Sequence, residues 1–112
     1  MNRCLFVLPL LFFVSATARA DRITQMNQND LCTYIARLQV AAHHSFVQGK
    51  PRADVSIEWH GDETQNEIEF VNKTVADAYI WLTKWKEVSN EPLPAQYFGD
   101  MVYQTCMTRK EL

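Results

Sequence analysis

Apolar residues recur at helical spacing in three separate stretches of the chain. The first stretch repeats every three or four positions, at Leu31, Tyr34 or Ile35, Leu38, Ala41 or Ala42, and Phe46. This period places side chains on one face of a helix. Asn29 or Asp30 is suited to cap the helix start, and Gly49 followed by Pro51 is typical of a helix end. The pattern predicts a helix over 30–48.

The second stretch carries a sequence signature of a helix start. Thr64 and Glu67 have the spacing of a capping box, in which each side chain satisfies a free backbone N–H group of the other residue. Helical spacing then continues for about five turns, through Ile68, Val71, Val75, Ala78 with Tyr79, Leu82 and Trp85. We therefore expect a second helix over 65–87.

The third stretch follows a polar connector that ends at Pro94. Proline is favoured in the first turn of a helix, and Phe98, Met101, Thr105 and Arg109 continue at helical spacing. This predicts a third helix over 94–109. The polar residues 21–28 are expected to be a loose segment that leads into the first helix.

Residues 54–60 have an ambiguous pattern. Val55, Ile57 and Trp59 alternate with polar residues, as in a half-buried strand, and Ile68 and Phe70 also alternate. One interpretation is an α+β fold with a short hairpin around residues 54–72. The capping box favours the other interpretation, an all-α bundle of three to four helices with residues 54–60 as a short helix or an extended segment.

The first twenty residues have the three parts of a secretory signal peptide. Arg3 precedes an apolar run from Leu5 to Val14, and Ala18-Arg19-Ala20 has the pattern of a cleavage site. The run is too short for a membrane span, which needs about 20 residues, and no later segment is apolar enough to span a membrane. We expect cleavage after Ala20, a periplasmic or secreted product, and a single domain over 21–112.

Cleavage would remove Cys4 and leave Cys32 and Cys106. Because an oxidising compartment favours disulfides, we expect these two residues to form one structural bridge, with an intermolecular bridge as the alternative. C-x-x-C spacing, typical of redox-active pairs, is absent. The loop closed by the bridge spans 74 residues, for which loop entropy predicts a stabilisation of up to about 4.5 kcal/mol.

Composition and charge restrict the function further. The chain has 112 residues and a formal charge of −2, so it is too short for a doubly wound nucleotide-binding fold and carries no general footprint for nucleic acid. His43 and His44 are adjacent rather than four apart, which does not fit the helical zinc pattern. We expect no metal and no cofactor.

The densest polar and aromatic cluster is Trp59-His60-Gly61-Asp62-Glu63-Thr64. The favoured interpretation is structural, because Gly61 can form a turn and acidic residues stabilise the start of a helix. Recognition of a partner and acid–base catalysis by His60 with Asp62 or Glu63 are the alternatives. No motif for a serine or cysteine nucleophile is present.

Aromatic residues also crowd the second predicted helix. Tyr79 and Trp85 share a face with Leu82, whereas Trp81 points away from it. Either Trp81 remains exposed for a partner or residues 54–60 cover it, and the sequence does not decide between these. The candidate interaction surface comprises Trp59, His60, Asp62, Glu63, Trp81 and Trp85.

The layout resembles a loose group of small secreted proteobacterial proteins of unknown function. The resemblance lies in the signal peptide, the helix after Cys32 with Ala36 and Ala41, Gly49-Lys50-Pro51-Arg52, the cluster at 59–64, Glu69-Phe70-Val71, and Val102-Tyr103 before Cys106. It implies a mostly helical periplasmic domain with one disulfide, and it carries over no catalytic residues.

The functional hypothesis is a non-enzymatic binding or interaction protein with an unidentified protein partner. A periplasmic stress chaperone or an inhibitor of a secreted effector is the alternative, and a small hydrolase-like enzyme is the third possibility. The sequence does not set the oligomeric state.

Overall fold

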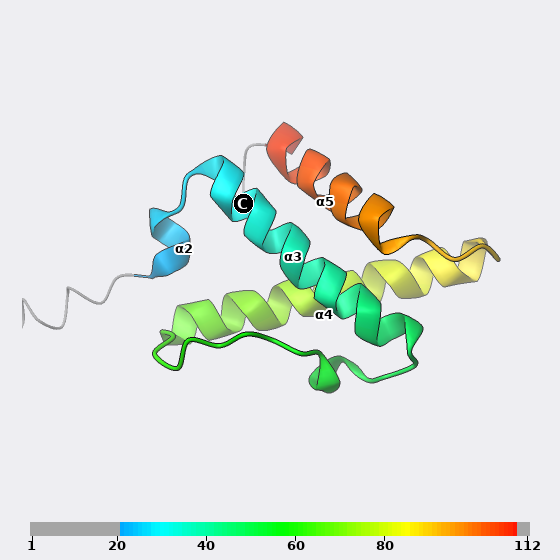
Figure 1. Ribbon diagram of the computed structural model, residues 1–112, viewed down its shortest axis with the longest axis horizontal. Helices are drawn as coiled ribbons and strands as arrows, with labels where there is room; N and C mark the ends of the chain where they lie inside the picture. The colour runs from blue at the N-terminus through cyan, green and yellow to red at the C-terminus, as the bar shows by residue number, and fades with distance from the viewer. Residues whose placement is uncertain (1–20, 110–112) are drawn as a thin grey trace, which may run out of the picture.

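The computed structural model describes residues 21–109, which form an all-α fold (Figure 1). Its helices are α2 (Arg22–Gln25), α3 (Gln28–Val47), the 3-10 turn η1 (Arg52–Asp54), α4 (Gln65–Val88) and α5 (Ala95–Arg109). The described part of the chain contains no strand, so the all-α prediction is confirmed and the hairpin alternative is wrong. The expected signal peptide, Cys4 and residues 110–112 lie outside the described residues.

Helix α3 begins two residues earlier than the sequence pattern predicted. Asn27 is the N-cap residue, and its Oδ1 accepts a hydrogen bond of 2.8 Å from the backbone N–H of Asp30. The prediction of Asn29 or Asp30 as the cap is therefore wrong, because the helix begins at Gln28 and both residues lie within its first turn. At the other end, Gly49 adopts a φ of +76°, the left-handed conformation that favours glycine after a helix.

The predicted second and third helices are both present, with small shifts at their ends. The capping box of α4 forms as expected between Thr64 and Glu67. Pro94 lies just before α5, and its carbonyl accepts the first helical hydrogen bond, at 3.0 Å from the N–H of Phe98.

Helix α3 packs against both α4 and α5, and it forms the centre of the fold. Most of the core lies where these helices meet, and its buried members are Ala42, Val75, Ala78, Leu82, Leu93 and Phe98. Burial of these apolar side chains is the main driving force for docking the helices. A second, smaller cluster around Cys32, Ile35 and Cys106 joins the start of α3 to the end of α5.

A glycine allows α3 and α5 to approach closely. A Cβ atom added to Gly99 would lie 2.8 Å from Cγ2 of Val40 on α3, which is closer than van der Waals contact allows. The absence of a side chain at this position therefore sets the spacing between the two helices.

The segment between α3 and α4 is extended apart from η1. Val55 and Ile57 are half-buried and pack against the main core, whereas the side chain of Trp59 is 45% exposed. The alternation of apolar residues therefore marks an extended segment with one buried edge, not a strand paired in a sheet.

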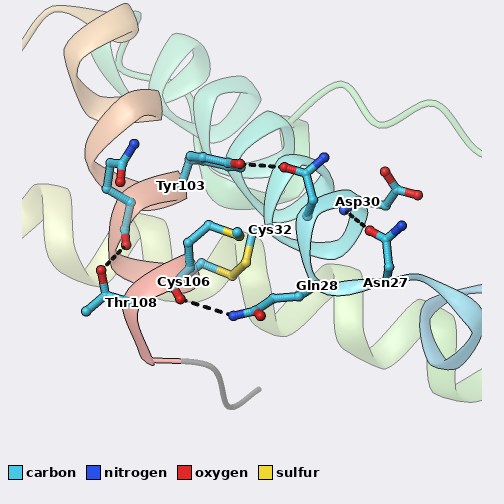
Figure 2. Close-up of a disulfide and its surroundings, with 10 residues drawn as sticks. Asn27, Gln28, Asp30, Cys32, Tyr103, Cys106 and Thr108 are labelled. Carbon is cyan, nitrogen blue, oxygen red and sulfur yellow. Dashed lines mark hydrogen bonds between the residues drawn. A yellow bond between two sulfur atoms is a disulfide. The ribbon is translucent and has the colours of Figure 1, made fainter.

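The disulfide between Cys32 and Cys106 is present and joins α3 to α5, with the two Cα atoms 5.6 Å apart (Figure 2). Polar contacts between the same two helices surround it. The side-chain amide of Gln28 donates to the carbonyl of Met107 at 3.1 Å, and the Tyr103 hydroxyl donates to Oδ1 of Asn29. The end of α5 is thus fixed to α3 by a covalent bond and two hydrogen bonds.

Among the described helices, none combines the length and the apolar character needed to cross a bilayer.

Candidate functional site

The six residues of the predicted interaction surface lie in two groups. Residues 59–63 precede the start of α4, whereas Trp81 and Trp85 lie in its C-terminal half. Sixteen residues separate Gln65 from Trp81, which corresponds to about 24 Å along a helix. The two groups therefore lie far apart along α4.

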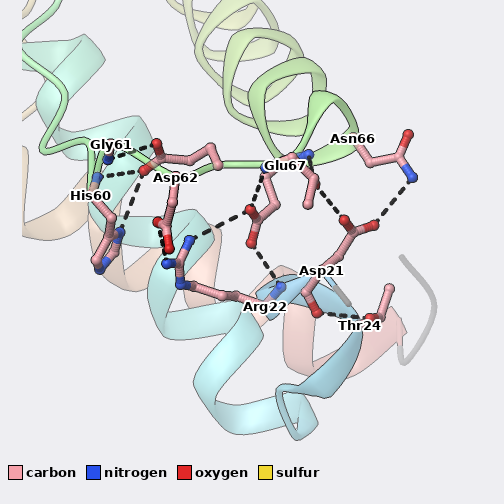
Figure 3. A network of polar contacts seen from close by, with 10 residues as sticks. Asp21, Arg22, Thr24, His60, Gly61, Asp62, Asn66 and Glu67 are labelled. Carbon is pink, nitrogen blue, oxygen red and sulfur yellow. Dashed lines mark hydrogen bonds and ion pairs between the residues drawn. The ribbon is translucent and has the colours of Figure 1, made fainter. Parts of the chain in front are cut away.

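Asp62 of the first group belongs to a polar network that we call the N-terminal anchor, formed by Asp21, Arg22, Asp62, Thr64 and Glu67 (Figure 3). The expectation of a loose segment over 21–28 is wrong at its start. The Asp21 carboxylate accepts hydrogen bonds from the Thr64 hydroxyl and, at 3.1 Å, from the Asn66 side-chain amide. The chain around Asp21 and α2 is thereby attached to the start of α4.

Glu67 is the centre of the N-terminal anchor. Its side chain is buried, with the residue only 5% exposed. The carboxylate accepts hydrogen bonds from the backbone N–H groups of Thr64, at 2.8 Å, and of Arg22, at 2.7 Å. The Arg22 guanidinium lies 3.5 Å from the same carboxylate. The capping box therefore also holds α2, a role that its local sequence pattern does not reveal.

Asp62 and Glu63 complete this group from the loop before α4. Asp62 accepts a hydrogen bond of 2.5 Å from the Arg22 guanidinium, which raises the pKa of Arg22. Glu63 accepts hydrogen bonds from the backbone N–H groups of His60, at 2.5 Å, and Gly61, at 3.0 Å. The hydrogen bond from His60 is the main cause that lowers the pKa of Glu63, since it stabilises the charged carboxylate.

The pair that sequence analysis considered for acid–base chemistry is in contact. Nδ1 of His60 lies 3.4 Å from Oε2 of Glu63, and the His60 side chain is 66% exposed. Tyr34 on α3 lies nearby, and its pKa is raised by burial and then by the charge of Glu63. Glu63 is committed to closing the turn through the backbone of His60 and Gly61, so the geometry supports the structural interpretation of this cluster.

The adjacent histidines of α3 have different environments. His43 is buried and stacks on Phe98, and its Nε2 lies 2.6 Å from the carbonyl oxygen of Leu93. His44 is exposed and bonds to Gln48. Within residues 21–109, no three histidine, cysteine or acidic side chains are grouped so as to hold a metal ion.

The second group lies at a groove between α4 and α5, with a volume of about 520 Å³. We call it the α4–α5 groove. Its α4 wall comprises Phe70, Lys73, Thr74, Asp77 and Trp81. Phe70, Thr74, Asp77 and Trp81 are spaced three or four apart over three turns, with Lys73 beside Thr74, so the wall forms one continuous stripe about 16 Å long. The stripe lies beside the core-facing stripe that the sequence analysis identified.

The opposite wall comes from α5, at Phe98, Met101, Val102, Thr105 and Arg109, and the floor includes Ile35 and Gln39 of α3. Cys106 also lines the groove, so the disulfide holds the α5 wall in place. The groove forms because α3 packs against both walls, while α4 and α5 approach each other through Trp81 and Phe98, whose ring centroids are 5.5 Å apart.

Trp81 lies at one end of the α4–α5 groove. Its ring stacks on Trp85 with centroids 5.7 Å apart, and the residue remains 38% exposed. Trp85 donates its indole N–H to the carbonyl of Glu91 at 3.2 Å. The structure thus gives both tryptophans fixed positions and leaves Trp81 partly open to solvent. Its covering neighbour is Phe98 of α5 rather than the segment 54–60 considered from the sequence.

The charged groups lie toward the other end. Phe70 packs against the cluster around Cys32 and Cys106, so this end of the groove lies near the disulfide. Lys73 and Arg109 line the groove here. Nζ of Lys73 is 3.1 Å from Oδ2 of Asp77, an exposed pair four residues apart. The groove therefore has an aromatic end, a floor of Ile35 and Gln39, and an end with two cations and one anion.

Sequence analysis missed most of the groove. Phe70 was assigned to a possible hairpin, and Lys73 and Arg109 carried no motif. The signal that was present is the second stripe on α4, in which Phe70, Thr74, Asp77 and Trp81 follow helical spacing next to the core stripe. Of the two alternatives for the second aromatic face, the structure agrees with a partly exposed Trp81, which is 38% exposed.

Comparison with known proteins identifies no relative: no family model, curated protein or solved structure matches the chain.

Proposed function

We propose that this protein is an exported, non-enzymatic binding protein that holds the apolar chain of an amphiphile in the α4–α5 groove. Export rests on the signal-peptide pattern of residues 1–20, and the resemblance to small secreted proteins agrees with it. The observation that carries the proposal is the groove itself. Its volume of about 520 Å³ lies within the range of about 300–1,000 Å³ that is usual for small-ligand sites.

The lining of the groove fits an apolar chain. Phe70, Trp81, Met101 and Val102 provide aromatic and aliphatic surface along its length. A stack of two tryptophans at one end offers a large apolar contact at low entropic cost, since both rings are already fixed. A partly exposed tryptophan in such a position is typical of a residue that dominates binding energy.

The size of the groove favours a single chain over a partner helix. A helix of three turns with its side chains is about 10–12 Å across and about 16 Å long. At the end formed by Trp81 and Phe98 the two walls are in ring contact, with centroids 5.5 Å apart, so a cylinder of this width cannot lie between them there. A helix would rest on the rim, whereas an extended hydrocarbon chain can enter.

The test uses the tryptophan indole N–H signals in a two-dimensional NMR spectrum of the purified protein. Dodecyl maltoside, a neutral amphiphile, is added below its micelle concentration. Trp81 and Trp85 line or flank the groove, so we expect their signals to shift and saturate, while the Trp59 signal does not move. Each methylene added to the alkyl chain is expected to tighten binding up to about fourfold, from about 0.8 kcal/mol per buried CH₂.

Matched variants check that the groove is the site. Trp81→Ala is expected to weaken binding about tenfold or more, or about 1.4 kcal/mol. Trp59→Ala removes an equally large exposed side chain away from the groove and should leave affinity unchanged. If Trp81→Ala unfolds the protein, Thr105→Trp fills the groove from an exposed position, with Gln104→Trp as its control. Equal effects of both members of a pair, or no saturable shift, would refute the proposal.

A further inference from the structure

The distribution of charge along the α4–α5 groove is uneven. Lys73 and Arg109 lie at the end near the disulfide, and Trp81 lies at the other end. Eight residues separate Lys73 from Trp81, which corresponds to about 12 Å along α4. The whole chain has a formal charge of −2, so a groove lined by two cations and one anion departs from the overall charge.

From this arrangement we infer that the ligand is a fatty acid, bound with its carboxylate at Lys73 and Arg109 and its hydrocarbon tail directed toward Trp81. The inference rests on the proposed function and adds the head group and the direction of binding. A guanidinium presents paired N–H donors that match the two oxygens of a carboxylate, and an ammonium supplies a further charge-assisted hydrogen bond.

The contacts of Lys73 are compatible with this role. Its partner Asp77 is four residues away on the same helix, and both side chains are mostly exposed. Exposed pairs of this kind are weak, so Lys73 can turn from Asp77 toward an anionic head at little cost. Arg109 makes no ion pair within residues 21–109 and lies one turn beyond Thr105 and Cys106 on the α5 wall.

The apolar part of the groove sets the direction of the tail. Beyond Lys73 and Asp77, the α4 wall continues to Trp81, and the facing α5 wall offers Met101, with the buried Phe98 beneath Trp81. A carboxylate placed at this end would lose water without gaining a cation, whereas the tail would gain aromatic contacts. The opposite orientation is therefore disfavoured at both ends of the ligand.

The experiment compares three amphiphiles with the same twelve-carbon chain and different heads: dodecanoate, dodecyl maltoside and dodecyltrimethylammonium. Affinities are measured from the Trp81 indole signal at low salt, below each micelle concentration. We expect dodecanoate to bind about tenfold more tightly than dodecyltrimethylammonium, with dodecyl maltoside between them, and we expect the difference to shrink as salt is added.

A double variant assigns the preference to the two cations. Lys73→Gln with Arg109→Gln should bring the three affinities within about twofold of one another and leave dodecyl maltoside binding unchanged. The matched control, Arg52→Gln with Lys84→Gln, removes the same charge from exposed positions that lie outside the groove, and it should keep the preference.

The direction of the ligand is tested with a fatty acid that carries a nitroxide near its methyl end. Paramagnetic broadening is expected to be stronger at the Trp81 indole than at the amide of Thr105, and the reverse order would overturn the assigned direction. Equal affinities for all three heads, or tighter binding of the cationic amphiphile, would overturn the inference and leave the proposed function standing. Failure of every amphiphile to bind would remove both.

Discussion

The buried carboxylate of Glu67 provides a sharp test of the N-terminal anchor. Glu67→Gln preserves the size of the side chain and replaces one acceptor oxygen by an NH₂ group. Oε1 accepts from the Thr64 N–H and Oε2 accepts from the Arg22 N–H, so either orientation of the amide leaves one backbone N–H without its acceptor. The substitution also removes the negative charge that faces the Arg22 guanidinium at 3.5 Å.

The expected loss is about 2–3 kcal/mol. A hydrogen bond to a charged group contributes about 1.5–3 kcal/mol, and a buried donor without an acceptor costs about 1–3 kcal/mol, though the two terms overlap. A domain of this size has a free energy of unfolding of about 5–10 kcal/mol. Urea unfolding followed by circular dichroism at neutral pH measures the change directly, and the melting temperature should fall by about 10 °C or more.

Glu69→Gln is the matched control. Glu69 lies two residues further along α4 and is exposed, and its carboxylate accepts one hydrogen bond of 3.3 Å, from the side chain of Gln65. The same chemical change there should alter the free energy of unfolding by less than about 0.5 kcal/mol. Equal losses for the two variants would refute the conclusion that Glu67 holds α2 on α4.

Three further predictions concern other parts of the fold. Replacing Cys32 and Cys106 by alanine should lower the free energy of unfolding by about 3–4.5 kcal/mol in a guanidinium titration, because the bridge closes a long loop; a loss below about 1 kcal/mol would contradict this. Gly99→Ala should destabilise the protein, since a clash with the stiff Val40 side chain costs about 1–3 kcal/mol and exceeds the gain in helix propensity of about 1 kcal/mol. The same substitution in a Val40→Ala background should stabilise it, and an equal loss in both backgrounds would argue against a clash. Because the pKa of Glu63 is lowered in the folded state, its contribution is present above the unfolded value of about 4.3 and disappears as the pH falls through the lowered value. Urea unfolding between pH 6 and pH 2 should therefore depend less on pH in Glu63→Gln, and parallel curves would contradict the assignment.

The helices could be predicted from sequence because their determinants are local. The apolar residues of α4 recur every three or four positions, and Thr64 and Glu67 of the capping box lie within one turn of each other. The disulfide was predictable for a different reason, since only Cys32 and Cys106 remain outside the expected signal peptide. In both cases, the residues allow few alternatives: helical spacing fixes which face of α4 is apolar, and two cysteines allow one intramolecular pairing.

The N-terminal anchor and the groove could not be predicted in the same way. The hydrogen bond from Arg22 to Glu67 joins residues 45 positions apart, and the polar composition of residues 21–28 contains no periodic signal for it. The α4–α5 groove depends on how two helices diverge from a third, and that geometry follows from side-chain packing at positions such as Gly99 and Phe98. Spacing along one helix identifies an apolar face without identifying what lies opposite.

The central position of α3 has a consequence for the way in which the molecule opens. Helix α5 is attached mainly through α3, and its contact with α4 centres on the aromatic pair of Phe98 and Trp81. Without its cross-link, α5 would form a separate cooperative unit, able to detach while α3 and α4 stay folded. The bond between Cys32 and Cys106 opposes this partial opening, because the end of α5 stays attached to α3. The disulfide thus couples the local stability of the two helices, and we expect amide hydrogens of α5 to exchange more slowly in the bridged protein than in the reduced one.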